Sequence, residues 1–165
     1  MIIAVRKLFP LLCLCGAAFA VGVAAEPSTG ADGQKPPLLT SQVVRWDEAA
    51  SRTSDWGEFR RYYTGETFGT KNVLTAVAVV EPGKAVHRAH RHAEEEYLVL
   101  VDGSGTWSLD GKEIPAQQGD ILYAEPWVYH GLTNTGSKQL IFVVVRFNSK
   151  GVELPPQPDD RPNEL

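Results

Sequence analysis

The stretch PGKAVHRAHRHAEEEYLVLVDG, residues 82 to 103, joins a histidine-rich segment to a strongly apolar one. Its first half holds His87, His90 and His92, which are three of the chain's four histidines, and its second half is the run EYLVLV before Asp102-Gly103. A short apolar run that ends at a turn dipeptide is typical of a buried β-strand. The stretch therefore predicts a strand over 96–101 that is preceded by a histidine-rich segment.

The neighbouring sequence repeats this pattern of short apolar runs separated by turns. We expect strands over residues 58–63, 73–80, 120–124, 129–134 and 139–147. The sequence TWSLDGKEIP predicts a hairpin, because Asp110-Gly111 suits a two-residue turn with positive φ. Residues 46–52 predict a short helical turn. Short strands with no long helical pattern between them indicate an all-β antiparallel sandwich or barrel over residues 40–148.

The two ends of the chain differ from this central region. Residues 1–25 have Arg6 and Lys7 before an apolar run and small residues at its end, which is the pattern of a cleaved signal peptide; a membrane anchor is the alternative. Residues 26–39 are expected to form a linker. Residues 149–165 are expected to form a flexible, proline-rich tail without a core of its own.

Export is the expectation that follows from the signal pattern. Both cysteines, Cys13 and Cys15, lie inside residues 1–25, so the remaining chain cannot form a disulfide. With no Asn-x-Ser/Thr site, these features favour a secreted or periplasmic protein, and a bacterial periplasm in particular.

The charge of the chain limits its partners. The formal net charge is −4, from 16 Lys and Arg and 20 Asp and Glu, and the loss of Arg6 and Lys7 would take it to −6. An acidic domain without a basic stripe argues against nucleic acid and, after signal cleavage, against a membrane surface. Neither of these two classes of partner is therefore expected.

The histidines are spaced as metal ligands. His90 and His92 are one residue apart, so their rings point to one face of an extended chain, and Glu96 follows at the start of the strand. His130 lies on another expected strand, which a closed β structure can bring across the interior. Such nitrogen and oxygen donors suit Fe, Mn, Ni, Cu or Zn. Histidines on an exposed loop are the alternative.

Two motifs resemble those of the cupin superfamily. The first places His90, His92, Glu96 and Gly103 at the family's spacing; the second, GDILYAEPWVYHGLTN, places Gly119, His130 and Asn134 in register. The resemblance covers about residues 83–134. It implies a double-stranded β-helix of the jelly-roll class, one divalent metal held by His90, His92, Glu96 and His130, with Fe or Mn favoured, and homodimers formed through sheet edges.

The second motif departs from the family pattern at two positions. Glu125 stands where cupins usually have proline, and Trp127 stands where they have glycine. Since glycine tolerates backbone angles that tryptophan does not, we expect the local conformation to differ from that of a typical cupin turn. Trp127 is expected to wall the cavity.

The resemblance leaves the reaction open. It implies a metal-dependent oxidoreductase of dioxygenase type on a small organic substrate; a metal-dependent isomerase, lyase or decarboxylase on a sugar or organic acid is one alternative, and a non-catalytic small-molecule or carbohydrate-binding protein is another. Tyr97, Glu125 and Tyr129 are the candidate catalytic residues of the cavity. Further candidates for its lining are Tyr62, Tyr63, Tyr123 and Arg146, whereas His87 is expected on a loop at the rim.

Overall fold

The computed structural model describes residues 37–165, so the expected signal peptide and most of the expected linker lie outside the described residues. The described chain is all β. Its strands are β1 (Ala50–Ser54), β2 (Gly57–Gly65), β3 (Thr70–Val80), β4 (Glu95–Asp102), β5 (Ser104–Leu109), β6 (Lys112–Gln117), β7 (Ile121–Ala124), β8 (His130–Thr133) and β9 (Leu140–Ser149). Within residues 37–165, no helix is long and apolar enough to cross a membrane.

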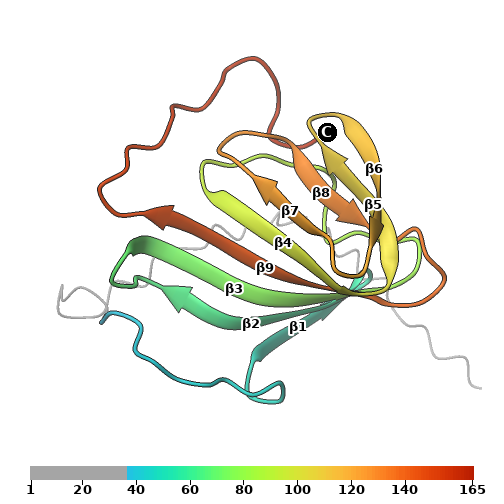
Figure 1. The fold of residues 1–165 in the computed structure, drawn as a ribbon, viewed down its shortest axis with the longest axis horizontal. Coiled ribbons are helices and arrows are strands. Elements are labelled where there is room, and N and C mark those ends of the chain that lie inside the picture. The colour runs from blue at the N-terminus through green and yellow to red at the C-terminus, as the bar shows by residue number, and fades with distance from the viewer. Residues whose placement is uncertain (1–36) are drawn as a thin grey trace, which may run out of the picture.

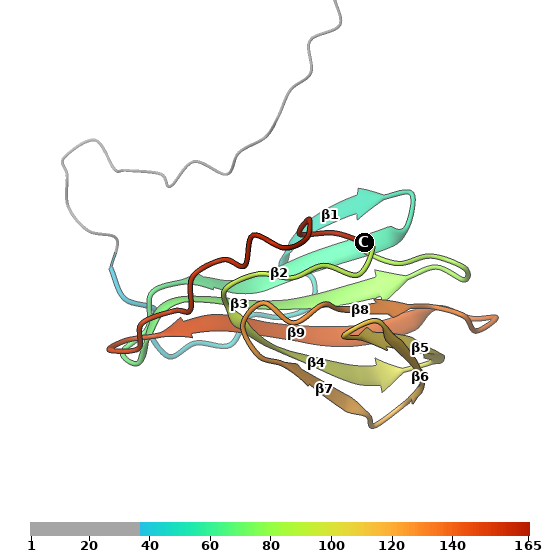
Figure 2. The same ribbon diagram turned by 90° about the horizontal axis from the view of Figure 1, so that it is seen from above.

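The strands form two antiparallel sheets (Figures 1 and 2). The larger sheet has the order β1-β2-β3-β9-β4-β7, and the smaller has the order β6-β5-β8. The long strands β3 and β9 pair in the middle of the larger sheet, where Ala76 faces Val144 and Ala78 faces Phe142. Sequence-distant strands are thus neighbours, as a jelly-roll requires.

The core lies between the sheets and has members from both. Ala78, Leu100 and Phe142 of the larger sheet are almost completely buried, and Trp107 and Leu132 of the smaller sheet belong to the same cluster. Because side chains alternate along a strand, each of these strands turns every second residue inward. The predicted strands therefore exist, and the predicted all-β class is confirmed.

The hairpin at Asp110-Gly111 is also confirmed. Asp110 has a φ of 48° and Gly111 a φ of 76°, as a two-residue turn between β5 and β6 needs. The prediction for residues 46–52 is wrong in its second half. The amide of Ala49 donates to the carbonyl of Arg45 in a single turn, but Ala50 already belongs to β1, because β1 pairs along its length with β2.

Candidate metal centre

The two histidine-bearing segments are joined through their backbones. The amide of His90 donates to the carbonyl of His130 at 3.0 Å, and the amide of His130 donates back to the carbonyl of His90 at 2.9 Å. Next to this pair Gly131 has no side chain, and a Cβ built there would lie 3.2 Å from the Cα of Ala89. The absence of a side chain lets the two segments approach, so that residues 40 positions apart present their rings to one point.

The rings of His90, His92 and His130 form a compact cluster. Their ring centroids lie 4.7 Å to 5.1 Å apart, and one ligand atom from each lies within 4.8 Å of those of the others. Three imidazole nitrogens at this separation can bind one metal ion. The sequence placed these three residues on one site, and the structure brings them together.

Glu96 completes the cluster from the start of β4. One carboxylate oxygen lies 3.3 Å from Nε2 of His92, and the other lies 3.3 Å from Nε2 of His130. The residue is 5% exposed. Burial raises the pKa of the Glu96 carboxyl, but hydrogen bonds from His130 and His92, when Nε2 of these rings carries a proton, outweigh burial and hold the pKa well below its usual range. Glu96 is therefore a carboxylate at neutral pH.

The remaining ring nitrogens fit a metal ion. Nδ1 of His92 lies 3.0 Å from the carbonyl of Glu94 and Nδ1 of His130 lies 2.8 Å from the carbonyl of Val128, so both Nδ1 atoms carry the proton and donate it. In the neutral form of each ring, this leaves a lone pair on Nε2 that can bind a metal ion. Both Nε2 atoms are buried without a hydrogen-bond partner, as is Nδ1 of His90. Buried acceptors facing one another are costly unless a cation satisfies them.

His90 is kept neutral by its surroundings. Burial, with the nearby rings of His87, His130 and His92, lowers its pKa to about 3. A metal binds the neutral imidazole, so a proton does not compete for His90 near neutral pH. Three neutral imidazoles and one carboxylate form a donor set that first-row transition metals accept.

The C-terminal tail packs against the segment that carries His90 and His92. Arg91 is 3% exposed, and its guanidinium donates to Asp160 at 3.1 Å, to the carbonyl of Pro158 at 3.2 Å and to the carbonyl of Arg161. The amide of Arg91 donates to the carbonyl of Asn163 at 2.9 Å. After β9 the chain thus returns across the molecule (Figure 1) and holds the outer side of the histidine segment.

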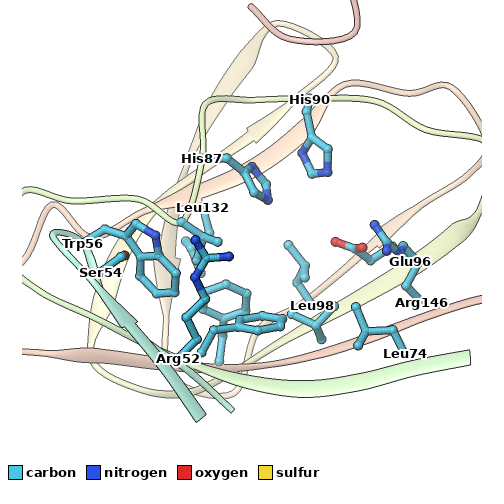
Figure 3. A pocket seen from close by; sticks show the side chains of 15 residues that line it. Arg52, Ser54, Trp56, Leu74, His87, His90, Glu96, Leu98, Leu132 and Arg146 are labelled. Atoms are coloured by element: carbon cyan, nitrogen blue, oxygen red, sulfur yellow. The ribbon is translucent and has the colours of Figure 1, made fainter. Parts of the chain in front are cut away.

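A cavity of about 540 Å³ opens beside the cluster along the inner face of the larger sheet (Figure 3). His90 and Glu96 form part of its wall, and most of the remaining wall is apolar. Its other lining residues are Arg52, Ser54, Trp56, Phe59, Leu74, Val86, His87, Leu98, Gly131, Leu132, Phe142, Val144 and Arg146. A volume of this size accommodates a small organic molecule next to the histidines.

Comparison with known proteins identifies the fold family. A family model described as "Cupin domain" matches residues 76–146. This chain carries a cupin domain. A cupin 2 conserved barrel domain protein from Salinispora arenicola superposes with a TM-score of 0.54 at 23% identity, covering 67% of this chain and 91% of that one. An RmlC-like cupin from Shewanella frigidimarina gives 0.56 at 14% identity, with 68% and 95% covered.

Curated relatives of the cupin domain include enzymes and a binding protein. Gentisate 1,2 dioxygenase 1 of Aquipseudomonas alcaligenes is 30% identical over 87 residues, which are 52% of this chain and 23% of that protein. The oxalate-binding protein of Thermotoga maritima is 27% identical over 88 residues, which are 53% of this chain and 73% of that protein. The chain thus spans about a quarter of the length of the gentisate dioxygenase.

The three expected catalytic residues of the cupin cavity are not on its wall. Tyr97 follows Glu96 on β4, so it faces the opposite side of the sheet, where it is 40% exposed. Glu125 is exposed after β7. Tyr129 is buried, but its hydroxyl donates to the carbonyl of Pro162 in the tail. The expectation that these side chains line the cavity is corrected accordingly.

Trp127 also differs from expectation. It has a φ of 66°, so this tryptophan adopts the left-handed backbone that favours glycine. Its amide donates to the carbonyl of His92, and its indole Nε1 donates to the carbonyl of Pro155. The side chain holds the tail and does not wall the cavity.

Two arginines line the cavity, one that the sequence indicated and one that it did not. Arg146, an expected candidate, lines the cavity beside Glu96, its cross-strand neighbour. Arg52 was not singled out, because β1 was expected to be part of a helical turn. Ser51, Arg52 and Thr53 are all polar, so no alternation of apolar and polar residues predicts a strand here. The pairing of β1 with β2 shows that Arg52 faces inward.

Proposed function

We propose that this chain binds one divalent transition metal through His90, His92, Glu96 and His130 and acts as a metal-dependent oxidoreductase of dioxygenase type on a small organic molecule. The observation that carries the proposal is the set of buried, unpartnered histidine nitrogens gathered around Glu96 at the edge of a cavity. When bound, iron or manganese would supply Lewis-acid and redox chemistry toward an oxygen-bearing substrate and O₂.

The roles of the protein groups follow from their contacts. The carbonyls of Glu94 and Val128 orient the rings of His92 and His130, and Glu96 supplies negative charge to balance the cation. The apolar wall of the cavity excludes water from the bound substrate. The dioxygenase part of the proposal is supported by two relatives of that name, the gentisate enzyme and a 5-nitrosalicylic acid 1,2-dioxygenase from Bradyrhizobium that is 29% identical over 84 residues.

The test combines metal analysis with oxygen uptake. Protein purified from its native compartment should contain one iron or manganese ion per chain. It should also consume O₂ when dihydroxy or hydroxy aromatic acids are added. Glu96→Gln should lower the metal content sharply, because outer-shell and ligand changes cost ten- to one-hundredfold or more in affinity. Unaltered metal content and activity in Glu96→Gln would remove Glu96 from the ligand set.

A non-catalytic binding function is the second candidate. It is favoured by the oxalate-binding protein, of which this chain covers a larger share than it does of the gentisate dioxygenase. A protein that binds metal and organic acid, but takes up no O₂ with any of the acids, would establish this function in place of the first.

We also propose that the chain is exported after cleavage behind Ala25. The proposal is supported by the signal pattern of residues 1–25. N-terminal sequencing of the protein from a fractionated native cell should give Glu26 as the first residue; a first residue at or near Met1 would contradict it.

A further inference from the structure

The cavity extends from the histidine cluster to the β1 edge of the larger sheet. Its wall includes the large apolar side chains of Trp56, Phe59, Leu98 and Phe142. Three of these four residues are aromatic, so a flat apolar body can pack among them. The volume of about 540 Å³ lies in the range of sites that enclose small organic ligands.

Two arginines stand on opposite sides of this apolar wall (Figure 3). Arg146 of β9 is the cross-strand neighbour of Glu96, which places it at the metal-binding end. Arg52 of β1 is the cross-strand neighbour of Phe59, and its guanidinium extends into the cavity below His87. Both side chains belong to the inner face of the sheet.

Neither guanidinium has a protein partner. Among residues 37–165, Arg52 and Arg146 make no side-chain hydrogen bond or ion pair, whereas Arg60 pairs with Glu58 at 2.8 Å and Arg91 pairs with Asp160 at 3.1 Å. The single carboxylate on the cavity wall, Glu96, already contacts His92 and His130. The cavity therefore offers two cationic groups and no free anion to neutralise them.

We propose that Arg52 forms a carboxylate-binding subsite that selects small aromatic acids as ligands of the cavity, while Arg146 lies at the opposite, metal-binding end of the same cavity. This inference rests on the proposed function, since the metal centre would supply the reacting end of the same cavity. A guanidinium matches a carboxylate with two parallel N–H donors, and its charge is permanent. Trp56, Phe59 and Phe142 line the same cavity and would pack against the aromatic part of the ligand.

The subsite contains a residue from outside the matched family region. Arg52 precedes residues 76–146 and lies on the edge strand β1. The edge strand thus adds a second cation to the cavity beside Arg146, and this cation is the specificity-determining group of the proposed subsite.

Calorimetric binding of salicylate and of its uncharged amide, salicylamide, tests the subsite. The protein as purified should bind salicylate at least about tenfold more tightly than salicylamide. Arg52→Gln should weaken salicylate binding about ten- to one-hundredfold, the range of a charge-assisted hydrogen bond, and should leave salicylamide binding nearly unchanged. Arg61→Gln is the matched control, because Arg61 is an exposed arginine of β2 that does not line the cavity.

Further measurements separate this inference from the metal proposal. Arg52→Gln should keep the metal content and thermal unfolding of the parent, and Arg52→Lys should recover part of the salicylate affinity by restoring the charge. The same titrations after metal removal should retain the difference between salicylate and salicylamide even if the metal assignment fails. Equal affinity for the two ligands, or equal behaviour of Arg52→Gln and Arg61→Gln, would overturn the subsite.

Discussion

His130 and the pair His90 and His92 reach the same centre from segments of different kinds. His130 begins strand β8, where β5 pairs with it, and it is 1% exposed. His90 and His92 lie between β3 and β4 in a segment outside the strands, and both are only partly buried. One side of the centre is therefore fixed by a sheet, while the other is a loop.

The contacts of the loop show what substitutes for a sheet. On its inner side the backbone of His90 pairs with that of His130, and on its outer side Arg91 and its amide are held by tail residues 158–163. The loop thus lies between β8 and the tail. The sheet alone fixes the position of a metal-binding residue on a strand. Metal-binding residues on a loop need contacts with distant parts of the chain to fix their rings.

The largest expected effect comes from removing a ring on each side. His130→Ala and His90→Ala should both abolish stoichiometric metal binding. In the metal-free proteins, His130→Ala should lower the free energy of unfolding by about 2–3 kcal/mol, because a fully buried side chain and its bond to the Val128 carbonyl are lost. His90→Ala should cost less than about 1 kcal/mol, since its buried Nδ1 has no bond to lose.

Urea unfolding of chelator-treated protein measures both values, and elemental analysis measures the metal. Equal losses of stability in the two variants would show that the loop is as rigid a part of the fold as β8, and the contrast between the two segments would then be wrong.

The next effect concerns the tail. Arg91→Met keeps the length and apolar stem of the side chain but removes the donors to Asp160, Pro158 and Arg161. We expect the tail to become accessible to limited proteolysis and the metal affinity to fall about tenfold, the low end of the range for residues that orient ligands. Competition with a chelator measures that affinity.

Arg88→Met is the matched control for Arg91→Met. Arg88 belongs to the same segment and is exposed. It should leave tail proteolysis and metal affinity as they are in the parent. If Arg91→Met lost metal affinity but its tail stayed resistant to proteolysis, the tail would not be the element that holds the histidine segment in place.

The difference between the two sides also explains what the sequence could predict. His90, His92, Glu96 and His130 were indicated by spacing, because strand alternation and a fixed motif are local properties. The placement of Tyr97 could have been corrected by the same alternation, since neighbouring residues on a strand face opposite sides.

Long-range packing left no such local signal. The tail is rich in proline and polar residues, and its docking depends on Arg91, which lies about 70 residues earlier. Likewise, Arg52 faces the cavity only because β1 pairs with β2. Neither contact follows from the periodicity of apolar residues. That periodicity predicts the secondary structure of a segment, but not the segments against which it packs.

A smaller effect is expected at Trp127, where the turn before β8 meets the tail. Its φ of 66° costs a non-glycine residue about 1 kcal/mol. Trp127→Ala keeps this strain and loses the indole bond to Pro155, whereas Trp127→Gly loses the bond but relieves the strain. Trp127→Ala should therefore be less stable than Trp127→Gly by about 1 kcal/mol in urea unfolding. Equal stabilities would mean that the left-handed backbone is not retained in the alanine variant.

The smallest effect near neutral pH concerns His90 in the loop. Because burial lowers its pKa to about 3, the unfolded chain takes up a proton at the usual histidine pKa of about 6.5, well before the folded metal-free protein does. Acidification from pH 7 should thus destabilise the metal-free protein progressively through this window, while a change from pH 7 to pH 8 should have almost no effect through His90. The slope should stay below the ~1.4 kcal/mol per pH unit of one proton, because His90 is partly exposed and solvent screens it.

His90→Gln removes this titrating group. Its free energy of unfolding should therefore fall less steeply between pH 7 and pH 5 than that of the parent. Parallel slopes would show that His90 in the folded loop takes up a proton as readily as a histidine in the unfolded chain.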